Sequence, residues 1–478
     1  MTITYDKLFI GGELTAPSST STFELVSPST EQSIGSVPEA LEADVDKAVD
    51  AARAAFDDPN GWSSWEPAKR AATMVRLAEE MESRAGEMAQ RVSMQNGMPV
   101  AVSGALEAVF PPLLLRYYAG LLSNPQDEVR PGMLGGSTLV RRSPIGVIGA
   151  IVPWNFPQAL AAFKYAPALA AGCTLVIKPS PETVLDSYLF AEAVQAAGIP
   201  AGVINIVQAG REVGAYLVQH PGIDKVAFTG STAAGRSIAE TCGRLLRPVT
   251  LELGGKSAAI ILDDASLDLA AIGEKLFTAT LANQGQACYL GTRILAPRSR
   301  YQEVVDTFTG FAASMRIGDA LDPTTQIGPM SSSRHRDRVE SYIAKGKSEG
   351  ARITTGGGRP RDTGWFVDPT VFADVDNGYT IAQEEIFGPV LSIIPYGDEA
   401  EAITIANDSD FGLGGTVWTA DHDHGVEVAK KIRTGTIGIN GYLPDPTAPF
   451  GGVKASGLGR ELGPEGLAAY QTVQSVYL

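Results

Sequence analysis

Residues 147–178 read VIGAIVPWNFPQALAAFKYAPALAAGCTLVIK, and this stretch decides the fold class. It predicts an apolar strand at 147–152, a helix at 155–171 and a strand at 174–177 that runs out at Lys178. The alternation continues downstream, with strands at 203–207, 225–228, 249–253 and 258–262 and helices at 185–197, 212–220 and 233–245. Short apolar strands that alternate with amphipathic helices indicate a parallel sheet covered on both faces. The chain is therefore expected to adopt a doubly wound α/β fold.

The regions on either side of this stretch extend the prediction. Apolar spacings of three and four predict helices over 42–91, and 104–122 predicts a helix that Pro111 and Pro112 either kink or begin. Residues 269–440 predict a second α/β region. The terminal segment 464–478 ends in alternating polar and β-branched or aromatic residues, which favours an edge strand. An uncovered edge strand has unpaired backbone groups that can bond to another chain. We therefore prefer an oligomer contact there over packing within the subunit.

Composition and charge limit the class of protein. The 478 residues are enough for roughly three domains, and the net charge of −16 argues against nucleic acid and anionic membranes as partners. Three cysteines cannot form a disulfide framework, and the first residues lack the regions of a signal peptide. Prolines and Lys164 interrupt the most apolar stretch, 145–172, so no membrane span fits there. We expect a soluble, cytoplasmic protein.

A phosphate-binding turn is one interpretation of residues 226–235, VAFTGSTAAG. The stretch predicts a strand, a glycine turn and a helix that Ser231 or Thr232 can cap, and the free N–H groups of such a helix suit a pyrophosphate. Lys178 lies at the carboxyl edge of the predicted sheet, where doubly wound folds bind ligands. Plain helix capping and a solvated lysine explain the same residues, so both interpretations stay open at this point.

Cys288 is the candidate nucleophile. It lies in 283–291, NQGQACYLG, where glycines and amides give a tightly turned polar backbone. The thiolate is the reactive form of cysteine. Cys173 and Cys242 lie in a predicted apolar strand start and a predicted helix, where an inert buried thiol is the better interpretation.

The candidate base is a carboxylate rather than a histidine. None of the four histidines lies in a glycine-rich strand-end context, and His422-x-His424 lacks a metal-binding helix motif. Glu252 lies between apolar neighbours in TLELGGK, 250–256, and burial would raise its pKa towards the range of a general base. A salt bridge to Lys256 is the alternative. Asn155 in PWNFP, 153–157, either caps a helix or donates to a developing oxyanion.

Six motifs together resemble those of the NAD(P)-dependent aldehyde dehydrogenase superfamily, of the hydrolytic, non-phosphorylating type. They are 153–157, 228–235, 251–256, 285–288, EEIFGP at 384–389 and PFGGVKASG at 449–457, and they occur in the family's order. The resemblance covers the chain from about Leu8 to the terminal strand. It implies an NAD(P)-binding domain of 1–122 and 144–253, a catalytic domain of 254–463, and a small β oligomerisation element of 123–143 and 464–478.

The resemblance also implies residue roles. Cys288 corresponds to the nucleophile, Asn155 with the Cys288 N–H to the oxyanion hole, Glu252 to the general base, and Lys164 to a further catalytic position. Positions that match cofactor contacts are Ile151, Val152, Pro153, Trp154, Lys178, Ser180, Gly210, Gly214, Phe228, Thr229, Gly230, Ser231, Leu253, Glu385 and Phe387. Positions that match the substrate tunnel are Phe110, Phe156, Phe163, Tyr289 and Phe450. No metal is implied. The implied reaction oxidises an aldehyde to the acid through a Cys288 thiohemiacetal and thioester, which Glu252-activated water hydrolyses.

Departures from the family pattern affect the choice of cofactor and substrate. The family often has glutamate three residues after the Lys178 position, where it holds the adenosine ribose hydroxyls, and this chain has Pro181 there, with Glu182 one place later. NAD is the expected cofactor, and NADP is possible because the missing carboxylate would repel a 2′-phosphate. Glu182 is a candidate substitute, although adjacent side chains of a strand point to opposite faces. Bulky Tyr289 follows the nucleophile, and Pro444 replaces an aromatic residue of some members. The aromatic tunnel predicts a hydrophobic or aromatic aldehyde, and a homo-oligomer, either a dimer or a tetramer, is expected.

Two other reactions use the same nucleophile. A CoA-acylating dehydrogenase would pass the acyl group to CoA, but Glu252 favours water. A cysteine esterase or acyltransferase would leave 228–235 and 385–387 without a purpose. A purely structural role is least favoured, because all three chemical groups are present.

Overall fold

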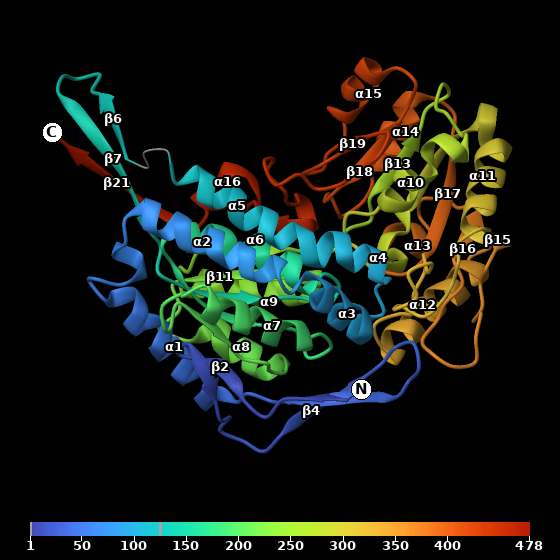
Figure 1. The fold of residues 1–478 in the computed structure, drawn as a ribbon. Helices are drawn as coiled ribbons and strands as arrows, with labels where there is room; N and C mark the ends of the chain where they lie inside the picture. The colour runs from blue at the N-terminus through green and yellow to red at the C-terminus, as the bar shows by residue number, and fades with distance from the viewer. Residues whose placement is uncertain (1, 124–126) are drawn as a thin grey trace.

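The computed structural model describes residues 2–123 and 127–478, whose strands form four sheets (Figure 1). The largest sheet has eight strands, of which the central five are parallel. Its spatial order is β20 (Gly457–Leu458), β12 (Val249–Glu252), β11 (Lys225–Thr229), β8 (Val147–Ile151), β9 (Thr174–Lys178), β10 (Ile204–Ile206), β2 (Leu8–Ile10) and β3 (Glu13–Thr15). The strands predicted from 147 to 253 all occur, with ends shifted by one residue at most.

Helices cover both faces of this sheet, which confirms the doubly wound arrangement. Side chains alternate along a strand, so neighbouring residues enter opposite cores. Ile148 and Leu175 pack in the core that contains α6 (Pro157–Ala171) and α7 (Leu185–Ala196). Val147 and Val176 pack in the core that contains α1 (Glu42–Asp57), α8 (Arg211–Gln219) and α9 (Thr232–Arg244).

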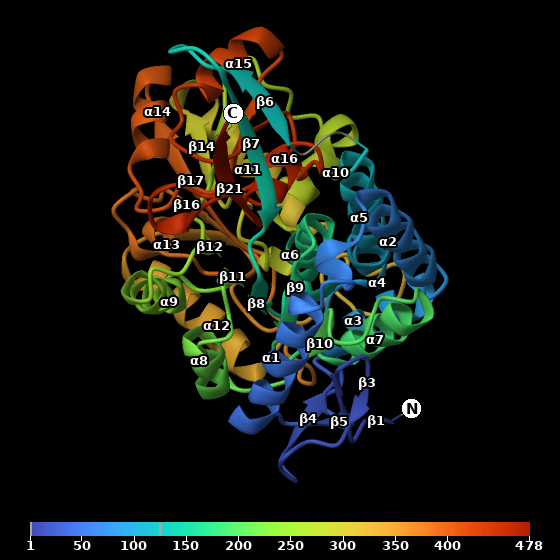
Figure 2. The same cartoon turned by 90° about the vertical axis from the view of Figure 1, so that its left-hand side faces the viewer.

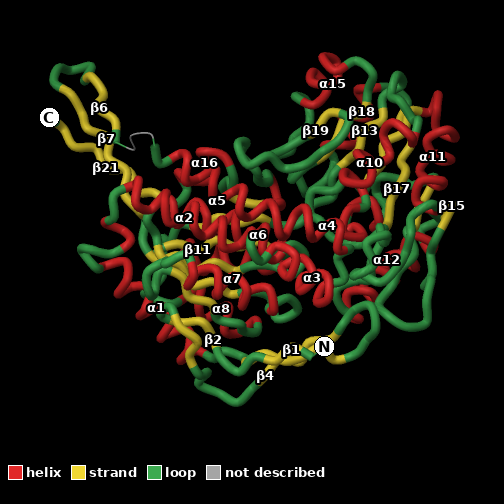
Figure 3. Tube along the Cα trace, in the orientation of Figure 1, coloured by secondary structure: helices red, strands yellow, loops and turns green. Residues whose placement is uncertain are grey.

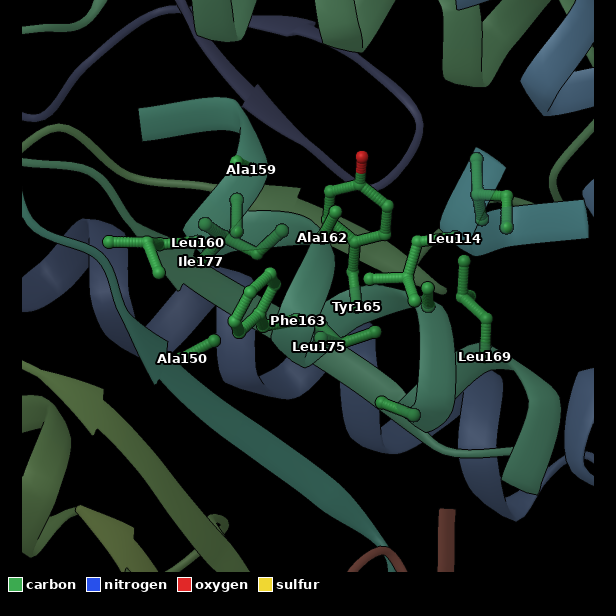
Figure 4. Close-up of a cluster of buried hydrophobic side chains, with 14 of the residues drawn as sticks. Leu114, Ala150, Ala159, Leu160, Ala162, Phe163, Tyr165, Leu169, Leu175 and Ile177 are labelled. Carbon is green, nitrogen blue, oxygen red and sulfur yellow. The ribbon is translucent and has the colours of Figure 1, made fainter. Parts of the chain in front are cut away.

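Helix α6 is buried along its whole length. Its side chains Leu160, Phe163 and Tyr165 belong to one buried cluster with the sheet residues Leu175 and Ile177 and with Leu114 of a neighbouring helix (Figure 4). A helix that is apolar on all sides is stable only inside a core, which is where α6 lies. The helix begins at Pro157, two residues later than predicted, because proline suits the first helical position. Asn155 therefore precedes the helix and does not cap it.

The predicted helix at 104–122 belongs to a longer helical run, Val100–Leu121. It consists of α4 (Val100–Ser103), a π-helical segment at Gly104–Val109 and α5 (Phe110–Leu121). Pro111 and Pro112 have no N–H to donate, and the wider π-turn before them accommodates the missing bonds without a break. This run is long and apolar enough to cross a membrane, but core helices of soluble proteins meet the same criterion, so the run is weak evidence for a membrane span. In the fold, 39% of its most apolar window is buried.

The second large sheet has seven strands and forms the core of the C-terminal half of the chain. Its order is β15 (Arg352–Thr355), β16 (Thr370–Ala373), β17 (Val390–Tyr396), β14 (Arg293–Pro297), β13 (Ala258–Ile261), β18 (Gly415–Trp418) and β19 (Gly438–Ile439). Strand β13 follows the 147–253 alternation along the chain but pairs with β14 and β18. The second α/β region is thus confirmed, and it begins with the strand predicted at 258–262.

The other helices pack around these two sheets. They are α2 (Pro67–Glu82), α3 (Ala85–Asn96), α10 (Leu269–Thr280), α11 (Tyr301–Ala313), α12 (Ser333–Ser348), α13 (Thr380–Gln383), α14 (Glu399–Asn407), α15 (His422–Ala429) and α16 (Gly463–Ala468). A small N-terminal sheet contains β1 (Ile3–Thr4), β5 (Ser33–Pro38) and β4 (Thr22–Val26).

The fourth sheet projects from the body of the protein (Figure 3), and Figure 2 views the molecule from the side on which it projects. It consists of β21 (Gln471–Tyr477), β7 (Ser137–Pro144) and β6 (Glu128–Pro131), with β7 in the centre. The predicted terminal strand is confirmed as an edge strand, and one of its two sides pairs with β7 of the same chain. Residues 124–126 of the predicted oligomerisation element lie outside the described residues. The domain limits and the oligomer contact stay predictions.

Candidate active site

Two cavities meet at Cys288. A cleft of about 440 Å³ opens between the carboxyl ends of the first sheet and the loops of the second, and an apolar tunnel reaches the same cysteine. Of the described residues, Asn155 and Cys288 alone border both cavities. A ligand in the cleft and a ligand in the tunnel would therefore meet at one thiol and one amide.

The backbone before Cys288 is held in an unusual conformation. Asn283 and Gln284 have φ values of 50° and 46°, in the left-handed region that non-glycine residues avoid. Their side chains fix the turn, because Asn283 Nδ2 donates to the Asn155 carbonyl at 3.0 Å and Gln284 Nε2 donates to the Gly97 carbonyl at 3.0 Å. Burial raises the pKa of the Cys288 thiol, and the nearby Glu385 and Glu252 raise it further. The resting thiol is therefore protonated and needs a base.

Asn155 lies between β8 and α6, beside the nucleophile. Its Nδ2 donates to the Gln286 carbonyl at 2.9 Å, which joins the amide to the Cys288 loop. Asn96 Nδ2 donates to the carbonyl of Trp154 at 3.1 Å and supports the same segment from behind. Of the two interpretations of Asn155, the geometry favours the donor to an oxyanion, since Phe156 takes the cap position of α6.

Glu252 is buried at the end of β12. Neither carboxylate oxygen accepts a hydrogen bond of good geometry from the described residues. A β-carbon at Gly451 would lie 2.6 Å from Glu252 Oε1, so a side chain at this position would displace the carboxylate. Burial, and secondly the negative charge of Glu461, raise the pKa of Glu252 well above its ordinary value. The alternative salt bridge to Lys256 is wrong: Lys256 Nζ is buried and has no hydrogen-bond partner among the described residues.

Lys164 is fully buried on α6. Its Nζ donates to Thr229 Oγ1 at 2.6 Å and to Glu461 Oε1 at 2.8 Å. Glu461 was missed by the sequence analysis, although it follows the 449–457 motif closely. Since Lys164 and Glu461 influence the pKa of Glu252 in opposite directions, the three residues form one electrostatic unit. Cys173 and Cys242 are buried away from both cavities, as predicted.

Eight of the predicted cofactor residues border the cleft: Pro153, Trp154, Thr229, Gly230, Ser231, Leu253, Glu385 and Phe387. Ser231 also caps α9, because its Oγ accepts from the Ala234 N–H at 3.3 Å. The Gly255 N–H donates to Glu385 Oε1 at 2.9 Å, and burial raises the pKa of this carboxyl to about 7. These residues place helix N–H groups at one part of the cleft and a carboxylate at another.

The other predicted cofactor residues lie outside the lining of the cleft: Ile151, Val152, Lys178, Ser180, Gly210, Gly214 and Phe228. Lys178 is buried at the end of β9, and its burial lowers its pKa to about 8. Ser180 does not border the cleft but orients a residue that does. Its Oγ donates at 2.5 Å to Oε2 of Glu182, which lines the cleft.

Four residues of the cleft lining were missed: Ser332, Arg334, His335 and Arg338. They lie at the start of α12, far along the chain from every motif that the sequence analysis used. Gly254 of the 251–256 motif and Glu182, the candidate substitute beside Pro181, also border the cleft. The helical spacing of His335 and Arg338 was the available signal, since residues three apart share a helix face.

All five predicted tunnel residues border the tunnel: Phe110, Phe156, Phe163, Tyr289 and Phe450. The ring of Phe163 lies 5.8 Å from those of Phe110 and Phe450, centroid to centroid. Leu106, Ala159, Leu160, Ala287, Leu443 and Pro444 complete the lining together with Asn155 and Cys288. No charged side chain of the described residues faces this tunnel, so it suits an apolar ligand.

Three comparisons with known proteins agree with this geometry. The model of the aldehyde dehydrogenase family matches residues 15–476. Geranial dehydrogenase of Castellaniella defragrans is 58% identical over 480 residues, which cover 100% of both chains. The crystal structure of a Mycobacterium tuberculosis aldehyde dehydrogenase complexed with NAD⁺ has a TM-score of 0.97 at 48% identity, over 100% of this chain and 99% of that one. A mutant of aldehyde dehydrogenase C from Pseudomonas syringae, complexed with NAD⁺ and octanal, has a TM-score of 0.94 at 38% identity, over 99% and 96% of the chains.

Proposed function

The chain belongs to the aldehyde dehydrogenase family, and on that premise we propose that it oxidises a hydrophobic aldehyde to the carboxylic acid with NAD⁺. The observation that carries the proposal is the meeting of a polar cleft and an apolar tunnel at Cys288 and Asn155. An oxidant and an apolar substrate can reach the same sulfur from the two cavities.

The cleft fits NAD⁺ by the chemistry of its lining. The N-terminal end of α9, with Ser231 at its cap, suits the pyrophosphate. The Glu385 carboxylate, held through one oxygen by the Gly255 N–H, suits the hydroxyls of a ribose. Glu385 and Phe387 lie with Cys288 in the same lining, so the nicotinamide end belongs near the thiol. When bound there, NAD⁺ accepts the hydride that the substrate carbon loses.

The first covalent step is attack of Cys288 Sγ on the aldehyde carbon. The thiol proton has to leave as the C–S bond forms, and ionised Glu252 accepts it. The carbonyl oxygen becomes negative, and the Asn155 amide and the Cys288 N–H donate hydrogen bonds to it. Oxidation of this adduct leaves the acyl group on Cys288 as a thioester.

Hydrolysis then regenerates the enzyme. Glu252 first releases the thiol proton to solvent and then removes a proton from the water that attacks the thioester carbon. The C–S bond breaks, the acid leaves, and Glu252 returns that proton to the sulfur. The ion pair of Lys164 and Glu461 controls how readily Glu252 ionises in this step.

Two observations support a hydrophobic aldehyde. The tunnel contains aromatic and aliphatic side chains and no charged group of the described residues. The names of two similar proteins point the same way, since one is a geranial dehydrogenase and the other was solved with octanal. An acyclic apolar chain of medium length matches both.

The test is a panel of short, long-chain, terpenoid and aromatic aldehydes with NAD⁺, followed by absorbance of reduced nicotinamide. We expect turnover that favours the apolar aldehydes, and its loss by about a thousandfold or more in Cys288→Ala. Cys173→Ala is the matched control and should keep activity. Equal loss in the control with retained folding, or no NAD⁺-dependent turnover by the wild type, would contradict the proposal.

A further inference from the structure

One face of helix α12 holds the segment 384–388 at the cofactor cleft. His335, Arg338, Val339 and Tyr342 are spaced by three and four residues and therefore share this face. Arg338 Nη2 donates to the Glu385 carbonyl at 2.8 Å, and the Tyr342 hydroxyl donates to Glu384 Oε2 at 2.7 Å. A β-carbon at Gly388 would lie 2.6 Å from Val339 Cγ2, so the helix and the segment are in close contact.

His335 contacts the same segment at Phe387. Its Nε2 lies 2.6 Å from the carbonyl oxygen of Phe387. A carbonyl only accepts, so Nε2 carries the hydrogen and donates. Burial lowers the pKa of His335 to about 4, and the imidazole is neutral at physiological pH. The charged groups that face it, Arg334 and Arg338, act in the same direction.

The carbonyl that His335 binds belongs to a strained residue. Phe387 has a φ of 62°, which contact between the β-carbon and the backbone disfavours outside glycine. Such a conformation persists only where neighbouring groups fix it. Loss of the hydrogen bond would let Phe387 relax and would move Glu385, two residues earlier.

His335 also reaches the other side of the cleft. Its ring lies 5.1 Å from that of Trp154 and 5.9 Å from that of Phe387, and the Trp154 and Phe387 rings are 5.4 Å apart. Trp154 precedes Asn155 in the chain. The imidazole therefore joins the loop of the second sheet to the segment that carries the oxyanion donor.

We propose that His335 is a positioning residue for the oxidation step, which fixes Phe387 and Glu385 where the nicotinamide ribose binds. The inference rests on the proposed function, since it assumes that the cleft holds NAD⁺. It assigns His335 no proton transfer and no contact with the reacting atoms.

Three substitutions distinguish the effect of the His335 hydrogen bond from the effect of its aromatic ring. His335→Gln keeps an N–H donor at about the reach of Nε2, His335→Asn keeps a donor only at the reach of Nδ1, and His335→Phe keeps a ring without a donor. The matched control is His422→Phe, because the His422 side chain at the start of α15 is 73% exposed. The measurements are the Kd for NAD⁺, kcat and KM for both substrates, and hydrolysis of an activated ester without NAD⁺.

We expect His335→Phe and His335→Asn to lose about tenfold in kcat/KM for NAD⁺, as one lost buried hydrogen bond would produce. His335→Gln should stay within about threefold of the wild type. The KM for the aldehyde and the rate of ester hydrolysis should change by less than about twofold in all three, because these depend on the tunnel and Cys288.

An unchanged kcat/KM for NAD⁺ in His335→Phe, or equal losses in the glutamine and phenylalanine variants, would overturn the inference. Parallel losses in NAD⁺ use, aldehyde KM and ester hydrolysis would reduce His335 to a general structural residue and also overturn it. If the phenylalanine variant does not fold, the glutamine and asparagine pair decides. Wild-type protein that does not bind NAD⁺ would instead refute the proposed function.

Discussion

Glu252 shares its buried surroundings with a second carboxylate, and that pairing controls the pH at which it can act. Glu461 raises the pKa of Glu252, whereas Lys164, 2.8 Å from Glu461, lowers it. A raised pKa means that the basic form of Glu252 is scarce at low pH and increases as the pH rises. Turnover should therefore increase with pH on its acid side.

Replacement of Glu461 should move this dependence. In Glu461→Gln the negative neighbour is gone and Lys164 loses its partner, and both changes lower the pKa of Glu252. We expect the acid limb of kcat to shift to lower pH by about one unit, the effect of roughly 1.4 kcal/mol on the ionisation. The exposed Glu465→Gln on α16 is the control, and an unshifted profile in Glu461→Gln would contradict the prediction.

Removal of the base should separate the two chemical steps. Glu252→Gln keeps the shape of the side chain but cannot take a proton from water. We expect steady-state turnover to fall about a hundredfold or more. Where thioester formation survives, stopped-flow absorbance should show one equivalent of reduced cofactor per subunit, followed by slow turnover. Steady-state turnover at the wild-type level would show that Glu252 is not the general base.

At the scale of elements, the end of β9 decides which cofactor fits. The chain leaves this strand at Lys178 and turns at 181–183, so the alternation of side chains along a strand no longer applies. Glu182 consequently borders the cleft, oriented by the Ser180 hydroxyl. A carboxylate there accepts a ribose hydroxyl and repels a 2′-phosphate.

We therefore predict that NAD⁺ is preferred and that NADP⁺ gives measurable activity. Glu182→Gln should move the ratio of kcat/KM values about tenfold towards NADP⁺, because the repulsion is removed. Pro181→Glu should move the ratio the other way. Glu192→Gln, on the exposed side of α7, is the control. Steady-state kinetics with both cofactors checks this, and a ratio that is unchanged in both variants would refute it.

Elements and motifs were predictable from sequence to different degrees. The strands of the first sheet follow from local periodicity, which sequence contains directly. The start of α6 was placed two residues early because the preference of Pro157 for the first helical position was not applied. Cys288, Asn155 and the tunnel aromatics came from motifs, and the structure brings them together.

The remaining site residues depend on contacts between distant parts of the chain. Glu461 lies 297 residues from Lys164, and His335 lies 52 residues from Phe387. Neither position has a local pattern that marks it, since a lone glutamate or histidine on a helix or loop is usually solvated. Only the fold shows that these residues face the site.

At the scale of the whole molecule, the projecting sheet is the expected contact between subunits. The apolar side chains Val473 and Tyr477 on β21 are 65% and 84% exposed, and Met133 and Leu134 between β6 and β7 are fully exposed. Exposed apolar patches of this kind mark interaction surfaces. The outer edge of β21 has no strand beside it in the described chain. We propose that a second copy covers this surface.

Deletion of 471–478 should therefore reduce the assembly state, measured by light scattering. The deletion begins after Tyr470, whose ring is buried and belongs to the core. Tyr477→Lys tests the same surface without removing β21, and Leu14→Lys, an exposed leucine on β3, is the control. An unchanged molar mass in both the deletion and Tyr477→Lys would show that the contact lies elsewhere.

Among the residues that the structure describes, only Asn155 and Cys288 border both cavities, and this division of the site has a consequence for how such enzymes diversify. Substitutions in the tunnel, at positions such as Leu106 or Leu443, can change the accepted aldehyde while every residue of the cofactor cleft stays the same. Mutations that explore new substrates are thus separated from those that would damage the oxidation machinery. A gene duplicate of this protein could acquire another substrate by a series of single replacements, each of which leaves a working enzyme.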